Sequence, residues 1–334
     1  MLKTTIWRFF SFFDSFVILM LFSIVLSFIA PGLGAKNGVL HLDLITHWGI
    51  TAIFFLHGAK LPFEQLRSGF TAWRLHIFIQ ATTFIAFPII GLTFYILSNN
   101  IISNEARLGF FFLCALPSTI SSSVALTSLS GGNISAALFN ASASNLLGMT
   151  ITPIIVSSIA ISANIHSISI IDAIVSVLQT LLVPFVFGQL MRPLLHRFLS
   201  RHASIITILD RAIIILIVFA AFCDANMKNV WAATPAMDIV GIIICAAILL
   251  WGATVCIQVA AKRLGFARGD QICTVFCASQ KSLASGAPIA AILFGGSPAL
   301  SIILLPIMVY HLLQLIIGSI MARDYIKTRE SETG

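Results

Sequence analysis

The sequence predicts an all-α polytopic membrane protein whose ten transmembrane helices form two inverted repeats of five helices. Three observations support this fold class: the composition, the succession of long apolar runs, and the placement of Lys and Arg. The chain has 334 residues, of which 58% are hydrophobic and 9% are charged, whereas soluble domains carry about 25% charged residues. We therefore expect a lipid bilayer around the protein. The net charge of +7 is typical of basic cytoplasmic loops and indicates no nucleic-acid partner.

Almost every window of the chain is apolar over the length of about 20 residues that crosses a hydrocarbon core of about 30 Å. Short polar connections separate the predicted spans, which are residues 11–31, 41–59, 76–97, 107–130, 134–162, 170–191, 211–231, 238–261, 271–295 and 298–322. We expect a single membrane domain, residues 1–334, with repeat one at about 11–162 and repeat two at about 170–322.

The basic residues predict the orientation of the chain. With the N-terminus in the cytoplasm, fifteen Lys and Arg fall on cytoplasmic segments and only Lys36, Arg107 and Lys228 on outer ones. Such an excess marks the cytoplasmic side, and a wrong number of spans would scramble it. The sequence therefore predicts a multi-pass protein of the cell membrane, the inner membrane in a bacterium, with both termini in the cytoplasm.

The two halves of the chain show weak similarity, as inverted repeats of secondary transporters do. Spans one and six begin with FFDSFVILM and IIDAIVSVL, which place Asp14 and Asp172 at equivalent positions. Spans four and nine contain FLCALPSTISSSVA and FCASQKSLASGAPIA, each with a Cys-Ala pair, a serine-rich stretch and a proline. Five is an odd number, so the second half would be inverted relative to the first.

Spans four and nine are predicted to be broken helices, because each carries proline and many small polar residues. Irregular backbone inside a membrane persists only where it is buried in protein or lines a water-filled cavity. Two broken helices at matching places indicate a central binding site, although small polar residues also serve ordinary helix packing. The candidate binding residues are Ser118, Thr119, Ser122 and Ser123 in span four, Asn133 in the turn before span five, Ser142, Ser144 and Asn145 in span five, and Ser279, Gln280, Lys281 and Ser282 in span nine.

Lys281 is the sharpest signal among these residues. A charged side chain at mid-bilayer costs at least about 2.5–3.5 kcal/mol, so it usually marks a functional site. The alternative is a structural pin, in which the lysine bonds to carbonyls that a helix break sets free. None of the twelve acidic residues falls at mid-membrane by these span limits. A cation site would therefore consist of neutral oxygens, and Lys281 would repel the cation unless it was deprotonated.

The segments LPSTISSSVALTSLSGGNISAALFNASASNLLGMTITP, FCASQKSLASGAP and FFLHGAKLPFEQLRSGFTAWRLH resemble the bile acid:sodium symporter superfamily, and within it the SBF-like branch. The resemblance covers nearly the whole chain and implies a core and a panel domain, with helices four and nine unwound where they cross. It also implies two sodium ions behind the crossing, held by a Ser-Asn pair in helix four, hydroxyls in helix five and a Glu-x-x-x-Gln-Asn run in helix nine. By this resemblance Ser122 and Ser123 stand near the helix-four pair, and Gln280 matches the Gln. Lys281 replaces the Asn, and Phe276 replaces the Glu.

The resemblance implies a secondary active transporter of a small organic anion, not an enzyme, with sodium as coupling ion and no other cofactor. An ammonium in place of a carboxylate reverses the local charge, which leads to a hypothesis of proton coupling. Lys281 would occupy the space of a sodium ion and would itself load and release a proton, while a weaker sodium site near spans four and five is the alternative. Two other functions stay open: a non-transporting membrane regulator of ion homeostasis, and a hydrolase with Ser279 or Ser282 as nucleophile and Lys281 as base. The sequence specifies no oligomeric state.

Overall fold

The computed structural model describes residues 15–60, 72–99, 101–162, 175–295, 297 and 299–333, and these residues form helices and no strands. Asp14 and Asp172 lie outside the described residues. In the described part of the chain, six helical segments are long and apolar enough to cross a membrane, which makes this a multi-pass membrane protein. These segments coincide with predicted spans three, five, six, seven, eight and ten, and they are Trp73–Leu97, Ile134–Ala160, Val175–Arg201, Ala203–Met227, Ala236–Arg263 and Leu300–Thr328.

The other four predicted spans coincide with shorter or interrupted helices. Spans one and two correspond to α2 (Ser15–Ile29) and α4 (Leu42–Lys60). Span four consists of α8 (Asn104–Ala115) and α9 (Ser121–Leu129). Span nine consists of α16 (Arg268–Ser279) and α17 (Leu283–Phe294). Both predicted breaks are therefore present, and they explain why neither span forms one long helix.

One group of helices is built around α4. It contains α2, the short α3 (Pro31–Gly34), the π-helical turn η3 (Leu178–Leu182), α12 (Val183–Arg201) and α13 (Ala203–Met227). Glycines let α4 and α12 approach closely: a Cβ added at Gly58 would lie 2.0 Å from the Phe185 carbonyl oxygen, and one added at Gly188 would lie 1.9 Å from that of Phe55. Small residues at helix interfaces commonly allow such packing in membranes.

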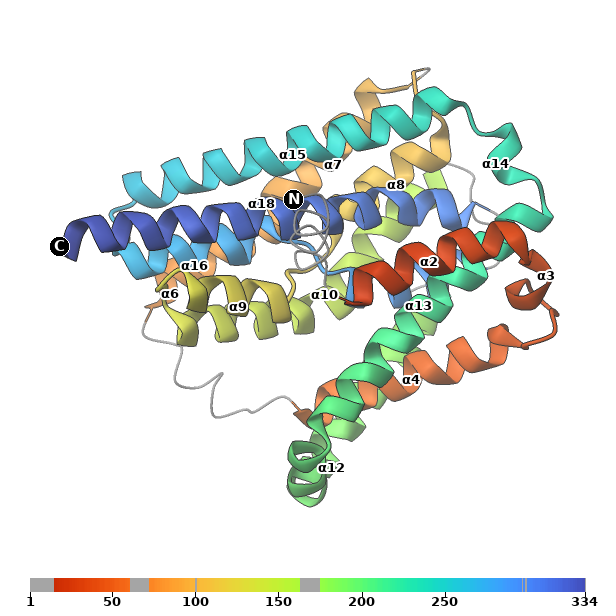
Figure 1. Ribbon diagram of the computed structural model, residues 1–334, viewed down its shortest axis with the longest axis horizontal. Helices are drawn as coiled ribbons and strands as arrows, with labels where there is room; N and C mark the ends of the chain where they lie inside the picture. The colour runs from red at the N-terminus through yellow and green to blue at the C-terminus, as the bar shows by residue number, and fades with distance from the viewer. Residues whose placement is uncertain are drawn as a thin grey trace, which may run out of the picture.

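The second group contains both broken helices. Its other members are α6 (Trp73–Ala81), the π-helical turn η2 (Thr82–Ala86), α7 (Phe87–Leu97), α10 (Ile134–Ser162), α15 (Ala236–Arg263) and α18 (Leu300–Thr333). Helix α8 packs against α7 and α18, and α9 packs against α10 and α16. In Figure 1, α15, α18, α16 and α9 extend to the left, whereas α12 lies at the bottom and α4 and α13 run from there toward the right. Helix α13 contacts α17 and α18, so the broken helices lie where the two groups meet.

Candidate functional site

The break between α8 and α9 is a local consequence of Pro117. Proline lacks a backbone N–H and pushes the preceding residue into extended geometry, and Leu116 accordingly has φ −73° and ψ 150°. Carbonyls in the break need other partners, because an unpaired buried polar group is costly. Each carbonyl from Cys114 to Ser118 accepts a hydrogen bond from elsewhere in the chain. Lys281 Nζ donates to Cys114 O at 3.1 Å and to Leu116 O at 2.8 Å. The other three bonds run from Thr152 Oγ1 to Ala115 O (2.7 Å), from Ser282 N to Pro117 O (2.9 Å) and from Asn145 Nδ2 to Ser118 O (2.8 Å).

The break between α16 and α17 is instead held by α18. The Tyr310 hydroxyl donates to Ser279 O at 2.6 Å. The Gln314 amide pairs with both backbone groups of Lys281, accepting from its N–H at 2.8 Å and donating to its carbonyl at 2.9 Å. Ser282 then starts α17, where its Oγ accepts from Ser285 N. Pro288 lies inside α17, so this break depends on tertiary partners rather than on proline.

Lys281 lies fully buried behind the point where the two breaks meet. Its Nζ donates to the carbonyls of Cys114 and Leu116 and, at 3.4 Å, to that of Thr83 in η2. The ammonium also lies 4.1 Å from the centroid of the Phe87 ring, within the range of a cation–π contact. A lysine has three N–H donors, and each has an acceptor here. This is the geometry of the structural pin, with the ammonium in a shell of carbonyl oxygens such as a small cation would need.

Hydroxyls of α9 gather around Gln280 on the neighbouring break. Gln280 Oε1 accepts from Ser122 Oγ at 2.7 Å and from Ser123 Oγ at 3.2 Å. Ser118 Oγ lies 3.4 Å from Ser123 Oγ. Phe276, which the resemblance sets at the position of a Glu, packs among Leu126, Ile272 and Ala322. Within the described ranges, no three His, Cys, Asp or Glu side chains converge on a metal position.

A cavity of about 100 Å³ lies on the α4 side of the crossing. Of the predicted residues, Thr119, Ser142, Asn145 and Ser282 line it, together with His57 of α4 and Phe185 of α12. The first residues of α9 and α17 also line it, so two half-helices begin there. Helix N-termini favour anions because their N–H groups carry a partial positive charge.

A family model described as the SBF-like CPA transporter family matches residues 14–327. The chain belongs to this transporter family. The protein named "Putative symporter YfeH" of Escherichia coli is 35% identical over 95% of this chain and 94% of its own length. "Sodium/bile acid cotransporter 7" of Danio rerio is 30% identical over 92% of this chain and 91% of its own length. The resemblance predicted from the motifs of spans four, five and nine is thereby confirmed.

In this SBF-like transporter, the remaining predicted residues have local roles. Ser144 Oγ accepts from Ser118 N at 2.9 Å, and Ser279 Oγ donates to Val275 O in its own helix at 2.6 Å. Asn133 lies apart from the crossing, at the start of α10, where it donates to Asp270 Oδ1 at 2.8 Å. Tyr310 and Thr152 were not among the predicted site residues. Tyr310 lies one helical turn before Gln314, on the same face of α18, and this spacing is the signal that could have identified it.

The Ser-Lys hydrolase finds no support in the contacts of the described residues. Ser282 Oγ donates to Ser285 Oγ at 3.2 Å, and the Ser279 hydroxyl bonds within α16. The three acceptors of Lys281 Nζ are backbone carbonyls. A lysine base would have to contact the hydroxyl that it activates, and the hydrogen bonds of the described residues contain no such pair.

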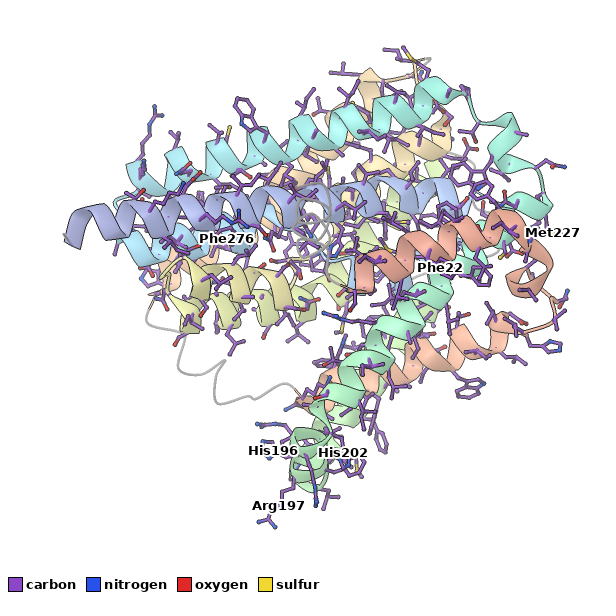
Figure 2. All side chains as sticks on the ribbon, viewed as in Figure 1. Phe22, His196, Arg197, His202, Met227 and Phe276 are labelled. Atoms are coloured by element: carbon purple, nitrogen blue, oxygen red, sulfur yellow. The ribbon has the colours of Figure 1, made fainter. Side chains whose placement is uncertain are left out.

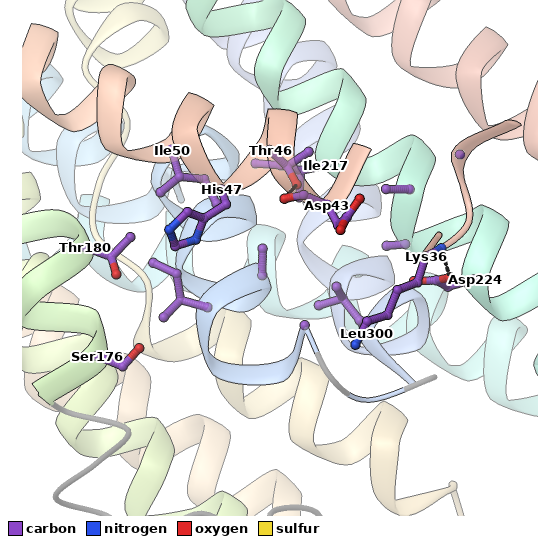
Figure 3. Close-up of a pocket in the computed structure, with 16 residues that line it drawn as sticks. Lys36, Asp43, Thr46, His47, Ile50, Ser176, Thr180, Ile217, Asp224 and Leu300 are labelled. Atoms are coloured by element: carbon purple, nitrogen blue, oxygen red, sulfur yellow. Dashed lines mark hydrogen bonds between the residues drawn. The ribbon is translucent and has the colours of Figure 1, made fainter. Parts of the chain in front are cut away.

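A second cavity, of about 380 Å³, opens near the Leu42 end of α4 (Figure 3). Its polar lining includes Lys36, Asp43, His47 and Asp224, and Lys36 N donates to Asp224 Oδ1 at 2.7 Å. The ends of α17 and α18 form the opposite wall. Helix α4 thus lines a cavity with each of its halves, and the buried Phe54 lies between the two lining segments.

Proposed function

We propose that this SBF-like family member is a secondary active transporter of a small organic anion. One observation carries the proposal: the two broken helices meet at a polar cavity between two helix groups. The N-termini of α9 and α17 face the cavity, and their N–H groups suit a carboxylate or sulfonate. Relatives named as a symporter and as a sodium/bile acid cotransporter support the same class of function.

We further propose the architecture and motion that go with this function. The group around α4 would be the panel domain, and the group with the broken helices would be the core domain, each with parts from both inverted repeats of five spans. Rocking of one group against the other would open the two cavities alternately. The distribution of Lys and Arg places the Lys60 end of α4 in the cytoplasm, so the cavity of about 380 Å³ would face outward.

Lys281 supports a mechanism without a sodium ion at its position. Its ammonium takes the carbonyls of Cys114 and Leu116 at 3.1 and 2.8 Å, which a cation behind the crossing would otherwise use. At an effective dielectric constant near 20, a second cation at about 4 Å would be repelled by about 4 kcal/mol. We therefore propose that Lys281 is a fixed internal cation and that a proton gradient, rather than a sodium gradient, drives transport.

The test is uptake by purified protein in proteoliposomes. Radiolabelled pyruvate, succinate, benzenesulfonate and taurocholate sample carboxylates and sulfonates of increasing size. Sodium and proton gradients are imposed separately, and counterflow is measured without any gradient. We expect counterflow of at least one anion and accumulation under a proton gradient alone.

Two outcomes would contradict these proposals in different ways. A folded protein that gives no counterflow with any anion would favour the non-transporting regulator. Accumulation driven by sodium alone would refute proton coupling, and would direct the search for the ion to Ser122, Ser123, Ser142, Ser144 and Asn145.

A further inference from the structure

A charged cluster lies at the Lys60 end of α4, beside the small cavity. His57 Nε2 lies 3.5 Å from Asp210 Oδ2, and Lys60 Nζ lies 3.4 Å from the same oxygen. The Asp210 side chain is only 16% exposed. Its other oxygen, Oδ1, is buried and has no hydrogen-bond partner among the described residues. A buried carboxylate in such surroundings requires cationic neighbours.

His57 belongs both to this cluster and to the cavity. The other described residues that line the cavity are hydroxyl, amide or apolar residues, so His57 is the single ionisable side chain among them. Its side chain is 30% exposed, and its ring packs edge-on against Phe54 at 5.7 Å. The imidazole therefore lies between a buried carboxylate and the space that an anion would occupy.

The other ionisable side chains at this end of α4 belong to α4 itself, α13 and α12. Lys60 lies on the same helix, and α13 contributes Asp210 followed by Arg211, whose guanidinium lies over the Phe16 ring at 5.8 Å. Helix α12 packs against this end of α4 through Gly188, Leu195 and Leu199, and the ionisable residues in this stretch of α12 are Arg192, His196 and Arg197. The η3 segment LQTLL carries no charge. Asp210 is thus the acidic partner that faces His57.

Lys281 differs from His57 in the two properties that proton coupling requires. Lys281 is 0% exposed and its three N–H groups already have acceptors. A single residue that carries the proton and binds the solute must reach water and must contact the solute in the same cycle. His57 meets both requirements from its place in the cavity lining.

We propose that His57 is the proton-carrying residue of the transporter and that it binds the substrate anion from the panel side; this inference rests on the proposed function. The protonated imidazole faces Asp210 through Nε2–H and offers its second N–H to a carboxylate or sulfonate. The core side binds the same anion through the N-termini of α9 and α17. After the rocking motion the anion leaves, and the imidazole gives its proton to water. One proton and one monovalent anion cross together, so the step moves no net charge.

The experiment compares wild type, His57→Gln and Asp210→Asn in the proteoliposome assay, with whichever of the four probe anions gives counterflow. One coupled proton sustains an accumulation of about tenfold per pH unit. We expect wild type to reach this ratio. His57→Gln should show weaker counterflow, because the anion loses one of its donors, and the counterflow that remains should not raise the anion above equilibrium when a pH gradient is imposed. Asp210→Asn should lower the accumulation, because it removes the carboxylate that faces the imidazole at 3.5 Å. The matched control is His196→Gln, at an exposed position of α12 (Figure 2) that is not among the residues lining the cavity, which should behave as wild type.

A second measurement needs no variant. Binding of the probe anion to wild-type protein at pH 8, followed with an indicator dye in weak buffer, should take up about one proton per anion. If wild type shows counterflow and His57→Gln still accumulates the anion under a pH gradient as wild type does, the role of His57 is refuted while the proposed transport function stands. Anion binding without proton uptake would do the same. Absence of counterflow in wild type would overturn the proposed transport function and this inference with it.

Discussion

Replacement of Lys281 by Met tests whether the ammonium stabilises the crossing of the broken helices. Met has a similar length but no donor, so the carbonyls of Cys114 and Leu116 lose their bonds of 3.1 and 2.8 Å. Each buried acceptor without a partner costs about 1–3 kcal/mol, which gives about 2–6 kcal/mol for the pair. The burial cost of the ammonium disappears in the variant, so we expect a net loss near the lower end, about 2 kcal/mol.

The assay for this variant is SDS-induced unfolding in mixed micelles, followed by tryptophan fluorescence, which yields the free energy of unfolding. Lys281→Gln should lie between Met and wild type, because its amide can serve only part of the carbonyl shell. Lys262→Met, at an exposed site in the last turn of α15, should change the free energy of unfolding by no more than about 0.5 kcal/mol. If Lys281→Met is as stable as Lys262→Met, the lysine does not hold the crossing together.

Two further substitutions test the surroundings in the same unfolding assay. Gly188→Ala should lower the free energy of unfolding by about 1–3 kcal/mol, because the new Cβ would lie 1.9 Å from Phe55 O and force α4 and α12 apart. The control is Gly252→Ala, whose added Cβ has no atom within 4 Å. Equal stability of the two variants would refute the close packing of α4 and α12. Tyr310→Phe removes the donor to Ser279 O at 2.6 Å, which should cost about 1–3 kcal/mol; an unchanged free energy of unfolding would show that the α16–α17 break does not depend on this bond.

The two breaks show how far the sequence could lead. Pro117 disrupts a helix wherever it occurs, so the break after α8 was predictable from local chemistry. Pro288 does not mark the position of the second break, because it lies inside α17 and the chain leaves helical geometry earlier, at Gln280. That break is stabilised by Tyr310 and Gln314 of another helix, and no local pattern announces such partners.

The candidate site was predictable in its residue types but not in its arrangement. Small polar residues stand out in apolar spans, so Ser122, Ser123, Gln280 and Lys281 were identified from composition alone. The structure divides the predicted residues between two sides of the crossing, with Lys281 behind it and Asn145 lining the cavity. His57 joins the cavity from α4 because of helix packing, which its sequence position near Lys60 does not reveal.

The sequence by itself determined the membrane environment, the long spans and the presence of a buried cation, because transfer of side chains into lipid depends on each residue and its near neighbours. Only the tertiary structure decided what the buried Lys281 binds and what His57 faces. Lys281 reaches carbonyls 165 and 167 positions away in the chain, and Asp210 is contributed by a different helix from His57. Hydrogen bonds and ion pairs act over a few ångströms, so these partners are fixed by the packing of whole helices rather than by any local stretch of sequence.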